Sequence, residues 1–248
     1  MSWTTRVFSR AGALALCTAL MGLFNCTVAN AASISYGDFG PLPSGTSFLD
    51  ITESSGTDSI PLYGPPTIFE TGLDFTPVSF VAVSTGGAPD ITDGQLTFTV
   101  MSSGLSSLSV EEAGDFSLLG IGTAATSVTA SASILATVTE INGAAVVPIV
   151  LAFNSNSVTH NLAANPGALQ PWSLVTTLDI GSQLGAGQRA TKVDIAINNQ
   201  MSAFSEPASA AFIAKKEFIV TTELIPEPAT FALASLALFG MAFSGRRR

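Results

Sequence analysis

Apolar and polar residues alternate with a period of two along much of the chain between residues 33 and 225. Over residues 128–138, valine, alanine and isoleucine occupy every second position, and serine or threonine fills most of the positions between them. Successive side chains of a β-strand point to opposite faces, so this pattern predicts a half-buried strand. Residues 96–100 and 193–197 repeat it over shorter lengths. We therefore expect a sheet with one buried and one solvent-facing side.

Turn-forming residues separate further β-rich runs, which cover residues 80–83, 146–153, 172–180 and 218–222. Asn142-Gly143, between two strand patterns, is typical of a hairpin turn. No segment of the body shows a sustained apolar stripe with the 3.6-residue period of a helix.

Many short strands with frequent turns predict an all-β fold. We expect a single β-sandwich of the jelly-roll or Greek-key type over residues 33–225. A barrel or a short β-solenoid is the alternative, and the lack of a repeat with a fixed period disfavours the solenoid.

Residues 1–32 have the three parts of a secretory signal peptide. Two arginines precede an uncharged, mostly apolar stretch over residues 11–24, which we expect to be helical. The small residues that signal peptidase recognises follow, at Ala29, Ala31 and Ala32. We expect cleavage after Ala31 or Ala32, and hence export of the chain through the inner membrane.

Residues 226–248 show a second three-part pattern. Pro226, Glu227 and Pro228 are followed by an uncharged, mainly apolar stretch over residues 229–245. Three arginines, Arg246, Arg247 and Arg248, then end the sequence. A helix over residues 229–245 is roughly 25 Å long, at the lower limit for crossing a hydrocarbon core of about 30 Å. Arginines that flank a membrane span stay cytoplasmic, so we predict a weakly held transmembrane helix with the body outside.

The order of Pro-Glu-Pro, apolar helix and arginine cluster resembles the PEP-CTERM sorting signal of Gram-negative bacteria. The resemblance covers residues 225–248 only. In that family an exosortase, an integral membrane enzyme, recognises the signal in species that make extracellular polysaccharide. The resemblance implies cleavage near the motif and only transient contact with the membrane. It also implies transfer of the body to the cell envelope, the cell surface or the extracellular matrix.

Charge and cysteine content narrow the functions open to the body. Only four of the nine basic residues lie between residues 33 and 225, against 17 of the 18 acidic residues. This acidic balance argues against binding to nucleic acid or to anionic lipid, because both require a basic face. Cys17 and Cys26 both lie in the predicted signal peptide, so the mature body has no disulfide and depends on a hydrophobic core.

Residue types that common catalytic sites require are missing from the sequence. His160 is the only histidine, which excludes a multi-histidine metal site, and we expect it in a polar strand or loop. The body has no cysteine nucleophile and no Gly-x-Ser-x-Gly elbow. We therefore expect a noncatalytic protein without a cofactor.

Carboxylates are the first remaining candidates for a site. Asp90 and Asp93 flank a turn and can offer oxygen ligands to Ca²⁺, although their spacing is not that of an EF-hand. Glu111, Glu112 and Asp115 form a cluster, and two carboxylates at a suitable separation can hydrolyse a glycosidic bond. Solvated turn residues are the simpler interpretation of both groups.

One tryptophan and two lysines complete the candidates. Trp172 follows a proline at the entrance to a predicted strand. It can serve as a stacking platform for a sugar ring, with core packing as the simpler alternative. Lys215 and Lys216 are expected on an exposed strand edge, where lysine discourages pairing with another sheet.

Two classes of function fit these features. The first is a noncatalytic structural component of a cell surface or extracellular matrix, associated with exopolysaccharide or biofilm. The second is a carbohydrate-binding or calcium-dependent adhesive module. The expected partners are signal peptidase and exosortase during export and extracellular polysaccharide afterwards, with no nucleic acid.

Overall fold

The computed structural model describes residues 32–226, which form strands and one short 3₁₀ helix, η1. The elements are β1 (Ala32–Phe39), β2 (Ser47–Ser55), β3 (Thr67–Phe69), β4 (Gly72–Phe75), β5 (Val81–Thr85), β6 (Asp90–Gly120), β7 (Ser127–Ile141), β8 (Ala144–Val150), β9 (Asn154–Asn161), β10 (Gly167–Asp179), η1 (Gly181–Gln183), β11 (Ala190–Phe204) and β12 (Ser209–Leu224). The predicted all-β fold is confirmed. The predicted signal helix and transmembrane helix lie outside the described residues. Within residues 32–226, no helix is long and apolar enough to cross a bilayer.

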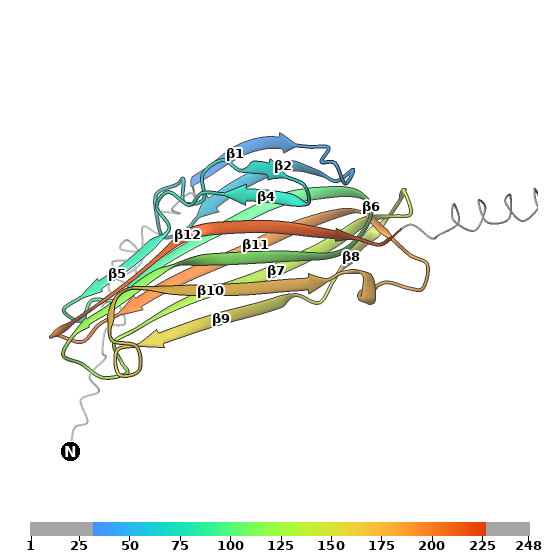
Figure 1. Ribbon diagram of the computed structural model, residues 1–248. Helices are drawn as coiled ribbons and strands as arrows, with labels where there is room; N and C mark the ends of the chain where they lie inside the picture. The colour runs from blue at the N-terminus through green and yellow to red at the C-terminus, as the bar shows by residue number, and fades with distance from the viewer. Residues whose placement is uncertain (1–31, 227–248) are drawn as a thin grey trace, which may run out of the picture. The chain divides into compact units, whose positions relative to one another are not determined.

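The strands form one antiparallel sheet that curls into a half-barrel, in place of the two separate sheets of the predicted sandwich (Figure 1). The long strand β6 is its centre. The first half of β6 pairs with β2 and β11, and the second half pairs with β10 and β12. We call the first set of strands, with β1, β7, β8 and β9, the first arm. The second arm comprises the second half of β6 with β3, β4, β5, β10 and β12.

The two arms end in β9 and β10, which no backbone ladder joins within residues 32–226. Asparagine side chains connect them instead. Asn154 Nδ2 donates to the carbonyl of Thr177 at 2.7 Å, and Asn156 Nδ2 donates to that of Val175 at 2.8 Å. We call this line of contacts the asparagine seam. It satisfies carbonyl groups that an edge strand otherwise leaves to water.

The period-two pattern identified several strands correctly. Residues 128–138 lie in β7, residues 96–100 in β6 and residues 193–197 in β11, and the apolar side chains at every second position are buried, whereas Leu135, on the other face of β7, is exposed. Asn142 and Gly143 have φ angles of 52° and 77° and form the predicted hairpin turn between β7 and β8. The apolar side chains of β8 are mostly exposed, however, and Val147 is 85% accessible to solvent. β8 pairs only with β7, so it lies at an edge of the sheet.

The core consists of inward-facing side chains from both arms. Tyr63, Phe75, Phe80 and Phe218 pack edge to face, with ring centroids between 4.9 and 6.2 Å apart. Aromatic rings favour this geometry because the positive edge of one ring meets the negative face of the next. These four rings form an aromatic cluster that fills the interior beside β12.

An ion pair lies against the aromatic cluster. Lys215 Nζ and Glu112 Oε2 are 2.9 Å apart, and their side chains are 0% and 1% accessible. The prediction that Lys215 lies on an exposed edge is wrong. β12 is an internal strand, and Lys215 continues the inward alternation of Ala211 and Ile213. The register shift between Lys215 and Glu217 then leaves Lys216 and Glu217 both exposed, and the inward positions resume at Phe218. Its neighbour Lys216 does lie on the surface, where it pairs with Asp115.

Gly114 lies where β6 contacts β10 and β12, and the packing there leaves no space for a side chain. A Cβ atom at this position would be 1.9 Å from Ala214 O and 2.9 Å from Trp172 Nε1.

We expect Gly114→Ala to lower the free energy of unfolding by about 1–3 kcal/mol, because the strands must shift to relieve the overlap. Urea denaturation followed by tryptophan fluorescence measures the change. Gly181→Ala is the control, since its Cβ would lie 3.6 Å from the nearest atom, Ser106 O. An equal loss in both variants would contradict the prediction.

Candidate functional site

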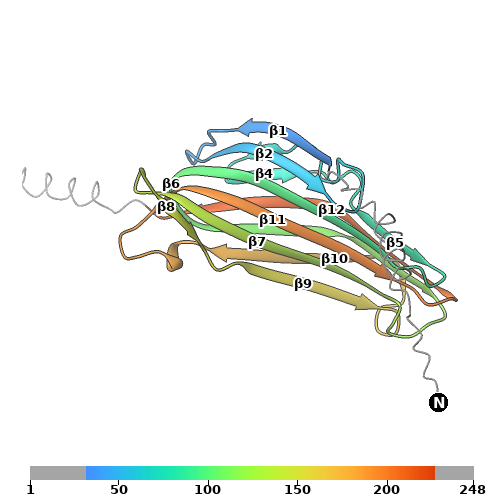
Figure 2. The ribbon, with the colours of Figure 1, turned by 180° about the vertical axis from the view of Figure 1, so that it is seen from behind.

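The solvent-facing side of the first arm carries a polar groove of about 760 Å³. It crosses β2, β6, β11, β7 and β9, which lie side by side in that order (Figure 2). Among residues 32–226, those that line the groove include no aromatic and no basic side chain. Its lining is dominated by serine, asparagine and glutamine.

The strand register aligns the polar side chains in rows across the groove. One row consists of Ser54, Gln95, Asn198, Ser133 and Ser155. The next row consists of Asp93, Gln200, Ser131 and Ser157. Five strands about 4.8 Å apart give a row roughly 19 Å long, which suits an extended ligand better than a single small molecule.

The chemistry of the groove follows from these residue types. Hydroxyl and carboxamide groups both donate and accept hydrogen bonds, and they carry no charge. Gln95 Nε2 donates to Asn198 Oδ1 at 2.6 Å, which fixes the orientation of both amides at the centre of the row. Their remaining donors and acceptors face the groove. Such a surface is complementary to a neutral polyhydroxylated ligand.

In the described part of the chain, Asp93 is the one acidic residue that lines the groove, and it anchors the end of β2. Its Oδ1 accepts hydrogen bonds from the backbone N–H groups of Gly56 and Thr57, at 2.9 and 3.0 Å. It also accepts from the hydroxyls of Ser55 and Thr57, at 3.0 and 2.8 Å. Burial acts to raise the pKa of Asp93, but these hydrogen bonds, led by that from the Thr57 hydroxyl, outweigh burial and hold the pKa below its ordinary value.

The two aspartates of the calcium hypothesis do not converge on one site. Asp90 Oδ2 accepts the backbone N–H of Val83 at 2.7 Å, whereas Asp93 holds the turn after β2. Three residues apart on one strand, they point to opposite faces of the sheet. In the part of the chain that the structure describes, no group of three or more His, Cys, Asp or Glu residues is placed to hold a metal ion.

The acidic cluster over residues 111–115 is also divided by the sheet. Glu112 is buried in the core, Glu111 is exposed, and Asp115 pairs with Lys216 at the surface. Alternation along β6 separates the first two side chains, so they do not face one cleft as a pair of glycosidase carboxylates does.

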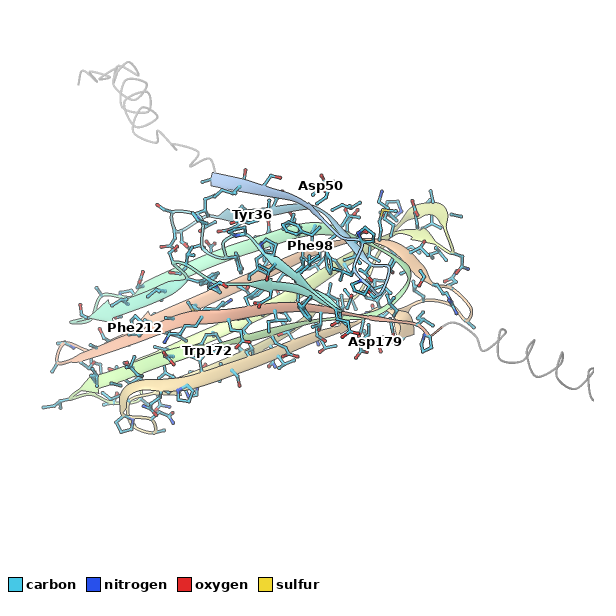
Figure 3. The ribbon with its side chains drawn as sticks, turned by 45° about the horizontal axis from the view of Figure 1, so that its top comes forward. Tyr36, Asp50, Phe98, Trp172, Asp179 and Phe212 are labelled. Carbon is cyan, nitrogen blue, oxygen red and sulfur yellow. The ribbon has the colours of Figure 1, made fainter. Side chains whose placement is uncertain are left out.

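Trp172 is buried in the protein, and His160 is half-buried. Trp172 is 4% accessible, and its Nε1 donates to the carbonyl of Ala214 at 3.1 Å (Figure 3). It therefore packs in the core and offers no stacking platform to a ligand. His160 lies in β9, the polar strand in which the sequence places it, and its imidazole stacks on Phe116 with centroids 4.1 Å apart.

The predicted processing sites fall at the margins of the described residues. Ala32 is the first residue of β1, and Pro226 accepts a hydrogen bond at its carbonyl from Arg189 Nη2 at 3.3 Å. The other predicted cleavage and sorting residues lie outside residues 32–226. These are Ala29, Ala31, Glu227, Pro228, Arg246, Arg247 and Arg248.

Sequence reasoning did not identify the groove. The serines and threonines that alternate through residues 129–139 indicate only the solvent-facing side of a strand. The partners of this strand are β9 and β11, and the neighbour on the far side of β11 is β6. Runs of alternating Ser, Asn and Gln in those segments were the available signal, but alternation alone does not state which strands are neighbours.

Residues 224–248 match the family model of the PEP-CTERM protein-sorting motif. The predicted resemblance is therefore confirmed, and the chain carries the sorting motif of exosortase-processed, exported proteins. A comparison with curated proteins found no match.

Comparison with solved structures gave only distant likenesses. One is TmCBM61 in complex with β-1,4-galactotriose, at 9% identity and a TM-score of 0.23, covering 79% of this chain and 90% of that chain. A second is the infectious bursal disease virus Gt strain, at 12% identity and a TM-score of 0.13, covering 82% and 58%. A third is the α-xylosidase from Xanthomonas citri, at 6% identity and a TM-score of 0.15, covering 77% and 28%. TM-scores this low assign neither a shared fold nor a function.

The hydrogen bonds to Asp93 predict a pH-dependent contribution to stability. Because the folded-state pKa is depressed, the contribution is complete above the unfolded-state pKa of about 4 and is lost as the pH falls through the folded value. We expect Asp93→Asn to lower the free energy of unfolding by about 1 kcal/mol at pH 7, because solvent screens the interactions of this largely exposed carboxylate. The difference between variant and wild type should shrink as the pH falls below 4, as chemical denaturation across a pH series can measure. A difference that stays constant across that range would contradict this role.

Proposed function

We propose that the chain is a noncatalytic protein of the cell surface or extracellular matrix whose β-domain associates with extracellular polysaccharide. The observation that carries the proposal is the sorting motif at residues 224–248, which indicates an exported, exosortase-sorted protein. In this proposal, signal peptidase removes residues 1–32, and residues 229–245 hold the chain in the membrane only until the exosortase acts.

The polar groove supports polysaccharide as the partner. Its rows of hydroxyl and amide groups extend across five strands, and they can bond to successive sugar hydroxyls. The body is strongly acidic, so a neutral polysaccharide suits it better than a polyanionic one. Aromatic platforms are missing from the groove lining within residues 32–226, so each sugar contact is weak and affinity depends on many contacts along a chain.

The groove also favours the second candidate, a carbohydrate-binding module, over the calcium-dependent version. Asp90 and Asp93 accept hydrogen bonds from different parts of the backbone, so the two carboxylates predicted as Ca²⁺ ligands do not lie together. The noncatalytic assignment has similar support, because Glu111 and Glu112 face different environments. Both candidates share one requirement, which is retention of the protein by polysaccharide through the groove.

The sorting step predicts a defect in processing when the motif is changed. We expect a variant with Pro226, Glu227 and Pro228 all replaced by alanine to remain in the membrane fraction with its C-terminal tail uncut, in a host that contains an exosortase. Cell fractionation and intact-mass measurement would detect the retained tail. Pro207→Ala, which leaves the motif unchanged, is the control. Normal processing of the triple variant would contradict the assigned route.

The groove predicts a loss of polysaccharide binding on removal of its central amides. We expect the double variant Gln95→Ala, Asn198→Ala to bind neutral exopolysaccharide about tenfold more weakly, since two hydrogen bonds to ligand contribute on the order of 1.4 kcal/mol. Affinity electrophoresis measures the change. The control is Ser109→Ala, Thr177→Ala, which removes a 2.8 Å hydroxyl pair on the outer face of the second arm. Equal binding by both variants would rule out the groove as the contact surface.

A further inference from the structure

Three side chains with complementary chemistry meet in the core, and each comes from a different strand. Glu112 lies on β6, Asn199 on β11 and Lys215 on β12. Glu112 Oε1 accepts a hydrogen bond from Asn199 Nδ2 at 2.5 Å, and Glu112 Oε2 lies 2.9 Å from Lys215 Nζ. The two oxygens of one carboxyl group thus hold the amine of Lys215 and the carboxamide nitrogen of Asn199 side by side.

A fourth group contacts the other end of the carboxamide. The Tyr63 hydroxyl donates to Asn199 Oδ1 at 2.7 Å and also lies 3.1 Å from the carbonyl oxygen of Gly94. Burial and, next, the negative charge of Glu112 raise the pKa of Tyr63 well above 10, so the hydroxyl keeps its proton. A fixed donor at this oxygen polarises the carbonyl and stabilises negative charge that develops there.

The surroundings of Lys215 favour a neutral amine. Its Nζ lies 4.2 Å from the ring centroid of Phe80, 4.9 Å from that of Phe218 and 5.6 Å from that of Tyr63. These ring faces attract a cation, as Glu112 does, so burial is the effect that favours the neutral form. An ammonium group has three donors, but within the described residues Glu112 is the one polar partner that Nζ contacts. Burial lowers the pKa of Lys215 against the opposing attraction of Glu112. A lysine without its extra proton is a nucleophile.

We propose that Lys215 and Asn199 join spontaneously through an intramolecular amide bond, with Glu112 as the catalytic group. This inference goes beyond the proposed function and does not depend on it. The site is buried and water is excluded, so the reaction competes with no hydrolysis. It requires the folded arrangement, because only folding brings β11, β6 and β12 together at this point (Figure 1).

The step balances without any external reactant. Lys215 Nζ attacks the carboxamide carbon of Asn199, a C–N bond forms, and the bond from that carbon to Nδ2 breaks. Glu112 first takes the extra proton of the Lys215 ammonium group, which leaves the neutral amine that attacks. Glu112 then passes this proton to Nδ2 and recovers one from Nζ, so the Asn199 nitrogen leaves as ammonia. The products are one secondary amide, one molecule of ammonia and a regenerated Glu112. Tyr63 donates to the carbonyl oxygen throughout.

The bond would tie the two arms of the sheet together across the core. Asn199 belongs to the first arm, and Lys215 belongs to the second. A side chain at Gly94 would prevent this approach, since a Cβ there would lie 2.7 Å from the Phe80 ring and 2.9 Å from the Tyr63 ring. The glycine allows both rings to close around the reacting groups.

Methionine positions make the bond directly testable in the protein purified from an exporting host. Cyanogen bromide cleaves after Met101 and Met201, which places Asn199 in the fragment 102–201 and Lys215 in the fragment that begins at Ser202. We expect the two fragments to remain joined on a denaturing gel. Their combined mass should be one ammonia below the sum that the sequence predicts. Mass loss alone is insufficient, because cyclisation of an asparagine also releases ammonia without joining the fragments.

Two variants and one measurement of folding complete the test. We expect Glu112→Gln to leave the fragments separate at full mass, and Lys216→Ala, which changes the exposed neighbour, to leave them joined. Near-UV circular dichroism reports whether the Glu112→Gln variant keeps its packed core. The wild-type result decides the proposal without any variant. Separate wild-type fragments, each with its sequence mass, would overturn it and leave Lys215 and Glu112 as an ion pair.

Discussion

The pairing of β6 along both of its edges is the constraint on which the rest of the sheet depends. One strand is the central member of both arms, so its register sets the position of each. Side chains alternate along it, and the same strand therefore delivers Gln95 to the polar groove and Glu112 to the core. A slip of one residue would exchange the two faces and remove both features together. The polar groove and the buried cluster around Glu112 thus both depend on the register of β6.

Alternation predicted the strands well wherever one face was apolar and the other polar, as in residues 128–138. It failed where a local irregularity changes the parity. At the register shift after Lys215 the alternation changes phase, so Lys215 faces the core while Lys216 and Glu217 both face outward. Local sequence does not anticipate a buried lysine there, because its partner Glu112 lies about a hundred residues away. The groove was missed for a related reason. Its rows are made of surface serines and amides, and these line up as a groove only when strands that are distant in the sequence become neighbours.

The C-terminal motif and the β-domain have different roles. The C-terminal motif directs the protein to the envelope, whereas the β-domain must then persist outside the cell without a disulfide. A hydrophobic core with a closely packed aromatic cluster provides much of that persistence. The buried Lys215, Glu112 and Asn199 are costly to desolvate, and a core of this size does not require them for packing alone. The proposed amide bond between Lys215 and Asn199, with Glu112 as the catalytic group, explains why these polar side chains lie in the interior.

The asparagine seam has a consequence for the proposed role in a surface or matrix layer. Free carbonyl groups along an edge strand are a template on which another copy of the chain can add. Asn154 and Asn156 occupy such carbonyls on β10 from within the same molecule. Neighbouring copies at high local density are then kept from growing into a continuous fibril along this edge. The copies in such a layer would be held together by the polysaccharide that they all bind. Each copy could then leave the layer and be replaced by another.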